Sequence, residues 1–411
     1  MTTRAYLIGD STVVLWGISS RERIGRQIAS IDALSLVEST DELAGADKVL
    51  LLRADYLFEV RTLTALLTRE GILTCDGTPA AAHVPAADLD TALNALQASQ
   101  SETAETGSLE RTSSLERTSS LERFEVEALQ TFEEELRRTD APTLALIREE
   151  DKVALSNQLY GSAYKGVTDL VTKFWWPKPA KWVVAWCAER RITPNMVTGF
   201  GVLLMLFACW AFLEGYFIAG LAAGWIMTFL DTVDGKLART TVKSSRVGHV
   251  LDHGMDIIHP PFWYWFWGLG LMVSPSLWGL EANTLYLWML AGYVFGRIAE
   301  QAFHLLGRTA MFTWQPFDSY FRLVTGRRNP NLILMTAFTL IGRPDWAFYS
   351  VVIWTVLSTL ILIVRLLMGL AVRQYTGEPL TSWMEDPEAA AARHPAAFRT
   401  FSTTRSAYGD A

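Results

Sequence analysis

Four aspartates at helical spacing lie directly beside the most apolar stretches of this 411-residue chain. The first two are spaced i, i+3 and the second two i, i+4, so each pair shares one face of a helix. They are Asp231, Asp234, Asp252 and Asp256. The flanking apolar runs, residues 220–230 and 257–272, are long enough to enter a membrane. Because a carboxylate at membrane depth is costly, it marks a functional site by default. The chain is therefore expected to build a helical membrane domain around an acidic site.

The clustering of these acids points to metal binding. Four carboxylates at one place cannot all stay ionised without cations, and hard divalent metals suit such an oxygen cage. A simpler interpretation makes them helix-end acids that pair with nearby bases. Those bases are Lys236, Arg239, Lys243 and Arg246. Pairing alone does not require four acids at helical spacing with small residues between them, so we expect a metal site.

The pattern between residues 231 and 256 resembles the signature of the CDP-alcohol phosphotransferases. The matching positions are Asp231, Asp234, Gly235, Ala238, Arg239, Gly248, Asp252 and Asp256. The sequence Thr193-Pro194-Asn195, just before the first long apolar run, is similar to that family at the same point. The resemblance covers about residues 155–375. It implies that an acceptor hydroxyl attacks the β-phosphate of a CDP-linked alcohol and expels CMP.

The resemblance also implies a role for each matched residue. The expected metal ligands, for two Mg²⁺ or Mn²⁺ ions, are Asp231, Asp234, Asp252 and Asp256. Asp256 is in addition the expected general base for the acceptor hydroxyl. The expected contacts to the CDP-alcohol are Gly235, Ala238, Arg239 and Gly248. Gly235 and Ala238 let a ligand approach the backbone, and Arg239 suits a phosphate.

Other polar residues near the motif have less specific roles. His249 and His253 share an i, i+4 spacing that can bind zinc, but they lie about 100° from the face of the acids. We expect them to pack or to support the site. Arg327 and Arg328 suit either the phosphate of an acceptor or a cytoplasmic loop. Arg297 and His304 are polar groups within an apolar segment and have no assigned partner.

The C-terminal half is expected to be an all-α, multi-pass integral membrane domain. About six spans are predicted, at residues 196–213, 216–232, 248–272, 286–306, 331–341 and 346–370. Lys and Arg gather in alternate loops, which places both termini and the acidic site on the cytoplasmic side of the cell membrane. The first 16 residues lack a signal-peptide pattern, which agrees with a cytoplasmic N-terminus.

Residues 155–192, ahead of the first span, mix lysines with tryptophans. This mixture is typical of a helix at an anionic membrane surface, and it also suits an anionic substrate held near the site. The membrane domain is then expected at residues 193–375 and a cytoplasmic tail at residues 376–411.

Residues 1–105 alternate strand and helix patterns, which predicts a parallel α/β sheet. The run L-L-L-R-A-D-Y-L-F at residues 50–58 resembles a strand of the sugar-phosphate and inositol-phosphate nucleotidyltransferases. In that family the acid matching Asp55 helps to hold metal and nucleotide. The Gly-rich N-terminal loop of the family is not recognisable here. We therefore expect a degenerate nucleotidyltransferase-like domain without that activity.

Residues 106–154 are expected to form a charged linker. The hexamer S-L-E-R-T-S occupies residues 108–113 and again 114–119, a period that does not fit a heptad coiled coil. Charged helices are predicted over residues 124–138 and 144–153.

The order of the two domains resembles the bifunctional inositol-phosphate cytidylyltransferase/di-myo-inositol-phosphate phosphate synthases. Because the front domain looks degenerate, the expected donor is CDP-diacylglycerol or another CDP-alcohol made elsewhere, including CDP-inositol. The expected acceptor is an inositol phosphate first and glycerol phosphate second. Resemblance also implies a homodimer in contact with membrane lipid.

A second function class is a non-enzymatic membrane protein that binds or transports divalent metal. A transporter needs polar groups in several spans, whereas these acids cluster at one face. The net charge of −7 does not suggest nucleic-acid binding. The three cysteines, Cys75, Cys187 and Cys209, show no metal-binding spacing.

Overall fold

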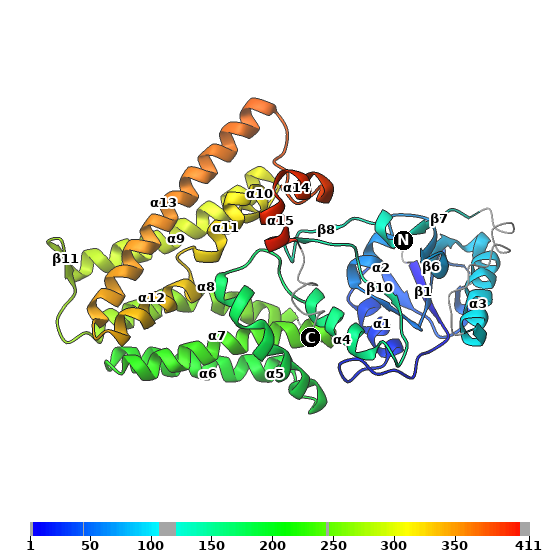
Figure 1. The fold of residues 1–411 in the computed structure, drawn as a ribbon, viewed down its shortest axis with the longest axis horizontal. Coiled ribbons are helices and arrows are strands. Elements are labelled where there is room, and N and C mark those ends of the chain that lie inside the picture. Colours follow the sequence, from blue (N-terminus) through cyan, green and yellow to red (C-terminus); the bar gives the residue numbers. More distant parts are fainter. Residues whose placement is uncertain (1–2, 44, 107–120, 244–245, 403–411) are drawn as a thin grey trace.

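The computed structural model describes residues 3–43, 45–106, 121–243 and 246–402, with side chains undescribed at 101–106 and 246–253. A sheet-containing N-terminal part lies at one end of the molecule and a group of long helices at the other (Figure 1). The predicted hexamer repeats fall outside the described residues.

The N-terminal part is built on a six-stranded sheet of order β2-β1-β3-β6-β5-β7. Its strands are β1 (Thr3–Ile8), β2 (Leu34–Leu36), β3 (Lys48–Arg53), β5 (Gly71–Cys75), β6 (Thr78–Pro85) and β7 (Arg123–Glu125). Strand β1 runs parallel to β2 and β3, but β6 is antiparallel to both β3 and β5. The sheet is therefore mixed, and the predicted all-parallel sheet is wrong.

A two-residue turn explains the antiparallel pair. Asp76 and Gly77 alone connect β5 to β6, and both have positive φ, 51° and 79°. An Asp-Gly pair with positive φ at both positions matches the twist of a tight hairpin, which only antiparallel neighbours can use.

Helices cover both faces of this sheet. They are α1 (Ser20–Ala29), α2 (Val60–Leu66) and α3 (Leu89–Thr106). Ile24 of α1 and Leu63 of α2 pack in one core with Leu50, whereas Leu96 of α3 packs in another with Leu51. Successive strand residues point to opposite faces, so each helix layer takes alternate residues of β3.

The segment predicted as a linker adds strands to the N-terminal part. Strand β7 pairs parallel to β5, and β10 (Leu144–Leu146) pairs antiparallel to β4 (Tyr56–Phe58). A further short pair joins β8 (Phe132–Glu133) to β9 (Arg138–Thr139). The helices predicted over residues 124–138 and 144–153 are therefore wrong, apart from the start of α4 at Lys152. Phe124, Val126 and Leu144 enter the core of the sheet, and this burial overrides local helix propensity.

The C-terminal half is helical. In order it contains α4 (Lys152–Ser162), a π-helical turn (Val171–Trp175), α5 (Pro177–Glu189), α6 (Pro194–Leu213), α7 (Phe217–Thr240), α8 (Arg246–Leu269), α9 (Ala282–Gly307), α10 (Met311–Trp314), α11 (Pro316–Val324), α12 (Arg328–Leu340), α13 (Pro344–Thr376), α14 (Pro387–Arg393) and α15 (Pro395–Phe401). The short strands β11 (Ser276–Leu277) and β12 (Leu280–Glu281) separate α8 from α9. Helix α7 packs against α5, α6 and α12, and α13 packs against α9 and α12.

Three described helices are long and apolar enough to cross a membrane, namely α6, α7 and α13. Their outer faces expose large apolar side chains, for example Leu203, Ile218 and Leu367 at 60–71 %. Contiguous apolar exposure of this kind suits contact with lipid. The other predicted spans coincide with the helices α8, α9 and α12, and the count of six stays a prediction.

A buried ion pair fastens α13 to α11. Arg365 Nε and Nη2 donate to Asp318 Oδ1 and Oδ2 at 2.6 and 2.7 Å, and both side chains are almost fully buried. Removing one partner of such a pair costs about 3–5 kcal/mol because a buried charge is left unpaired. We therefore expect Asp318→Ala to lower the thermal unfolding midpoint in detergent. Asp345→Ala, which breaks the exposed Arg343–Asp345 pair, should cost less than about 1 kcal/mol. Equal shifts in the two variants would contradict this assignment.

Candidate functional site

Helices α6 and α7 bring the first acids of the motif against the start of a span. Thr193 caps α6 by accepting from the backbone N–H of Met196, and Pro194 occupies the first turn, as suits a helix start. One turn further, Thr198 Oγ1 donates to Asp234 Oδ2 at 2.5 Å. The side chain of Asp234 is therefore oriented by the same short segment that begins α6.

Arg328 joins the two remaining described acids. Its Nη2 donates to Asp231 Oδ2 of α7 and its Nη1 to Asp256 Oδ1 of α8, both at 2.5 Å. Arg328 is the first residue of α12, so three helices meet at this point. The structure thus places Arg328, whose role the sequence left open, inside the acidic site.

The three described carboxylates surround one small cavity of about 20 Å³. Its lining includes Asp231, Asp234 and Asp256, together with Thr198. This volume is about that of one ion or water molecule, and three carboxylates are the oxygen donors that hard divalent cations prefer.

The residues present therefore fit such a cation in donor chemistry. Among the side chains that the structure describes, no three His, Cys, Asp or Glu groups already converge at ligating distance. The predicted ligand Asp252 is outside the described side chains, as are Gly248, His249 and His253.

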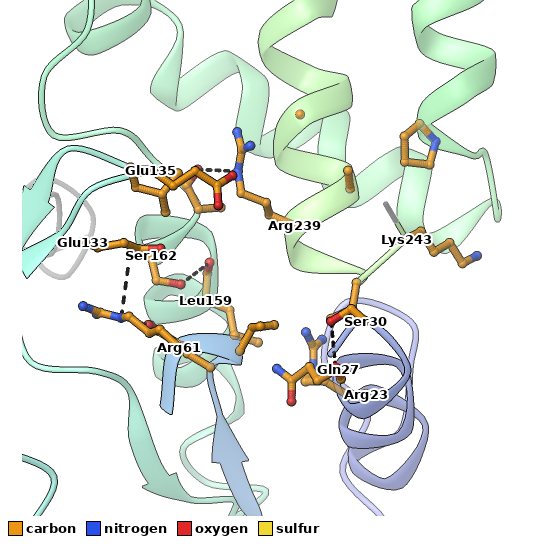
Figure 2. Close-up of a pocket in the computed structure, with 18 of the residues that line it drawn as sticks. Arg23, Gln27, Ser30, Arg61, Glu133, Glu135, Leu159, Ser162, Arg239 and Lys243 are labelled. Atoms are coloured by element: carbon orange, nitrogen blue, oxygen red, sulfur yellow. Dashed lines mark hydrogen bonds and ion pairs between the residues drawn. The ribbon is translucent and has the colours of Figure 1, made fainter. Parts of the chain in front are cut away.

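A second cavity, of about 360 Å³, opens along α7 beyond Asp234 (Figure 2). Gly235, Ala238 and Arg239, three of the predicted nucleotide contacts, all line it. Arg239 is held by a hydrogen bond of 2.9 Å from its Nε to the carbonyl oxygen of Ala163. A Cβ on Gly235 would lie 3.1 Å from Arg239 Nη2, so glycine gives this guanidinium room to lie against the helix.

A third cavity, of about 420 Å³, is dominated by basic side chains. They are Arg137, Lys165, Lys236, Arg239, Arg297, Arg322, Arg327 and Arg328, against the acids Glu135, Asp169, Asp231, Asp256 and Glu300. We call this space the cationic cavity. Cationic groups gathered around one concave space create a positive potential that attracts anions.

Two basic side chains of the cationic cavity would be stabilised by a bound anion. Among the described residues, nothing pairs with the buried Nε and Nη1 atoms of Arg322. Burial, with Arg327 close by, lowers the pKa of Arg322 to about 9. Burial, with Arg137 and Arg239 close by, likewise lowers the pKa of Lys165 to about 8. An anion in this space would stabilise the charged form of both groups.

Several residues of the cationic cavity were missed from the sequence. Asn329 Nδ2 donates to Asp169 Oδ1 at 3.0 Å and so ties the start of α12 to the segment ahead of the spans. Arg327 pairs with Glu300 of α9. Glu300 is the member of this pair that was missed. It could have been found from its position three residues after Arg297 in an otherwise apolar helix, because charges within a membrane span mark functional sites. By contrast, His304 is half-exposed and lies 3.8 Å from Glu134.

Comparison with known proteins relates the C-terminal half to one enzyme family. Residues 191–361 match the family model described as CDP-alcohol phosphatidyltransferase. A 70-residue stretch, 17 % of this chain and 37 % of the relative, is 41 % identical to the archaetidylinositol phosphate synthase of Pyrococcus horikoshii. A 120-residue stretch, 26 % of this chain and 29 % of the relative, is 28 % identical to cholinephosphotransferase 1 of Rattus norvegicus. The chain thus matches about a third of the length of these curated relatives. Its C-terminal half, with the acidic motif inside the matched residues, contains a CDP-alcohol phosphatidyltransferase domain.

Proposed function

We propose that this chain is a membrane phosphotransferase that moves a phosphoalcohol group from a CDP-alcohol to an acceptor hydroxyl and releases CMP. One observation carries the proposal. The acidic cavity shares Thr198 and Asp234 with the 360 Å³ cavity, and it shares Asp231 and Asp256 with the cationic cavity. The carboxylates therefore lie between the 360 Å³ cavity and the cationic cavity, each of which is large enough for a ligand.

In this proposal the donor lies along α7. Its nucleotide occupies the 360 Å³ cavity beside Gly235 and Ala238, and Arg239 pairs with its phosphate. Two Mg²⁺ or Mn²⁺ ions, held by Asp231, Asp234, Asp252 and Asp256, would neutralise charge on the pyrophosphate and on the leaving group. Phosphoryl-type transfer depends on this positioning and neutralisation more than on covalent help.

The acceptor approaches from the opposite side of the carboxylates. Asp256 takes the proton of the acceptor hydroxyl as the new bond from oxygen to the β-phosphorus forms. The bond from the β-phosphorus to the bridging oxygen breaks, and CMP leaves with that oxygen. Arg328 holds Asp256 in place through its 2.5 Å contact.

The cationic cavity supports an acceptor that itself carries a phosphate. Arg322 and Lys165 would pair with this phosphate, which would give a partner to the buried Nε and Nη1 atoms of Arg322 and favour the charged form of Lys165. The similarity to an archaetidylinositol phosphate synthase favours an inositol phosphate over glycerol phosphate.

The donor, in this proposal, is made by another protein. Both carboxylate oxygens of Asp55 accept from Arg53, at 3.0 and 2.7 Å, so the acid expected to hold metal in a nucleotidyltransferase is already paired. This supports a degenerate N-terminal domain and a donor such as CDP-diacylglycerol. We further propose a homodimer in the cell membrane with both termini and the site on the cytoplasmic side, on the basis of loop charge.

The test is CMP release by the purified full chain in detergent with Mg²⁺ or Mn²⁺. CDP-diacylglycerol and CDP-inositol are each paired with inositol phosphate and with glycerol phosphate. We expect metal-dependent CMP from one pairing and none when the acceptor is omitted. Folded protein that binds the metal but makes no CMP from any pairing would favour the alternative of a divalent-metal binding or transport protein.

A further inference from the structure

The N-terminal part of the chain supplies one wall of the 360 Å³ cavity. Arg23 and Gln27 of α1, with Ser30 at its C-cap, line this cavity opposite Gly235 and Ala238 of α7. Figure 2 shows the α1 side chains on one side of this space and Arg239 on the other. A domain that resembles a degenerate enzyme thus lies directly against the proposed donor site.

Specific hydrogen bonds hold α1 in this position. Arg23, only 2 % exposed, donates through Nη1 to the carbonyl oxygen of Thr240 at 2.7 Å and through Nη2 to that of Leu15 at 2.9 Å. Arg26 Nη1 donates to the carbonyl oxygen of Thr241 at 2.6 Å. Thr240 is the last residue of α7. These guanidinium groups therefore donate hydrogen bonds to backbone carbonyl oxygens that have no partner within the helix.

A ring contact adds to this attachment. The ring of Trp16 stacks on Tyr160 of α4 with 5.8 Å between the centroids, and Trp16 Nε1 donates to the carbonyl oxygen of Ser156. Polar contacts therefore hold α1 against the end of α7, and the segment just before α1 is held against α4.

Gln27 is a residue of this wall, and only one of its two side-chain polar atoms makes a hydrogen bond within the described part of the chain. Its side chain is 3 % exposed, and Nε2 donates to the carbonyl oxygen of Phe58 at 2.8 Å. That bond fixes which end of the amide is the donor, so Oε1 is left as an acceptor. Within the described part of the chain Oε1 has no hydrogen-bond partner. A buried acceptor without a partner is costly, so this oxygen is expected to accept a hydrogen bond from a group outside the described chain.

We propose that the N-terminal part forms the base-recognising wall of the donor site and that Gln27 Oε1 accepts a hydrogen bond from the exocyclic amino group of cytosine. This inference rests on the proposed function, because it takes the 360 Å³ cavity as the nucleotide site. Cytosine presents an amino donor where uracil presents a carbonyl acceptor. A uracil oxygen would face the Gln27 oxygen, so the same contact excludes a UDP-linked donor.

The test compares CMP and UMP binding to the purified full chain in detergent with Mg²⁺, by titration calorimetry. We expect the unsubstituted chain to bind CMP at least about tenfold more tightly than UMP, and Gln27→Met to reduce this ratio to less than about threefold. Gln97→Met is the matched control, because Gln97 is an exposed glutamine of α3 on the other face of the sheet. The ratio of affinities does not depend on the fraction of protein that is folded, so loss of folded protein cannot imitate the result.

The outcomes separate this inference from the proposed function. A clear preference for CMP that Gln27→Met leaves intact overturns the role of Gln27 while the phosphotransferase function stands. Equal binding of CMP and UMP by the unsubstituted chain also overturns it. Absence of CMP binding, together with absence of CMP release in the activity assay, overturns the proposed function itself.

Discussion

Replacing Asp256 by asparagine is expected to lower the rate of CMP formation about a thousandfold. Asparagine has nearly the same size and can still accept a hydrogen bond from Arg328, so the contact seen at 2.5 Å can be kept. It cannot take a proton from the acceptor hydroxyl, and it removes one negative charge from the acidic cavity. Both losses act on the transition state more than on the binding of the donor.

Initial rates of CMP release at saturating donor, acceptor and Mg²⁺ measure this effect. Asp345→Asn serves as the matched control, because Asp345 lies at the start of α13 and pairs with exposed Arg343. We expect the control to keep the full rate. An Asp256→Asn variant that retains more than about a tenth of the rate would show that Asp256 is not the general base.

Replacing Arg322 by methionine is expected to raise the KM for the phosphate-bearing acceptor about a hundredfold, with little change in the KM for the CDP-alcohol. Methionine preserves an unbranched side chain of similar length but removes the charge. Truncating one partner of a buried, charge-assisted contact typically costs about 2–5 kcal/mol. Because Arg322 lines the cationic cavity and not the 360 Å³ cavity, the loss should fall on the acceptor alone.

Separate titrations of donor and acceptor in the CMP assay distinguish this result from general damage. Arg393→Met, an exposed arginine of α14, is the matched control and should leave both constants unchanged. Equal increases in the two KM values would indicate a distorted site. An unchanged KM for the acceptor would show that the cationic cavity does not bind the acceptor.

The sequence predicted the parts of the site that lie close together along the chain. Asp231 and Asp234 are one turn apart on α7, so helix periodicity alone places them on one face. The Thr193-Pro194-Asn195 start of α6 was equally visible, because an N-cap and a first-turn proline act within a few residues. The Asp76-Gly77 pair is a local turn signal too, but the sequence prediction of a parallel sheet rested on the alternating strand and helix pattern alone, and it was wrong.

Other features required contacts between distant segments. Strand β7 and β10 form because Phe124 and Leu144 fill the N-terminal core, which no local pattern in that charged segment reveals. The cationic cavity draws Arg137, Lys165, Arg297 and Arg322 from four separate segments. A side chain in each of these segments has many alternative positions, and only packing of the helices selects the one in which they converge.

The sequence by itself determined the acidic motif, the helices that carry it and the family of the C-terminal half, because helical spacing and motif identity are local properties. Only the tertiary structure decided that Arg328 joins Asp231 to Asp256, 97 and 72 residues away along the chain, and that Gln27 lines the same cavity as Gly235. These contacts arise when buried surfaces of separate elements pack together. Their free energy depends on all the packed elements at once, so no single stretch of sequence encodes them.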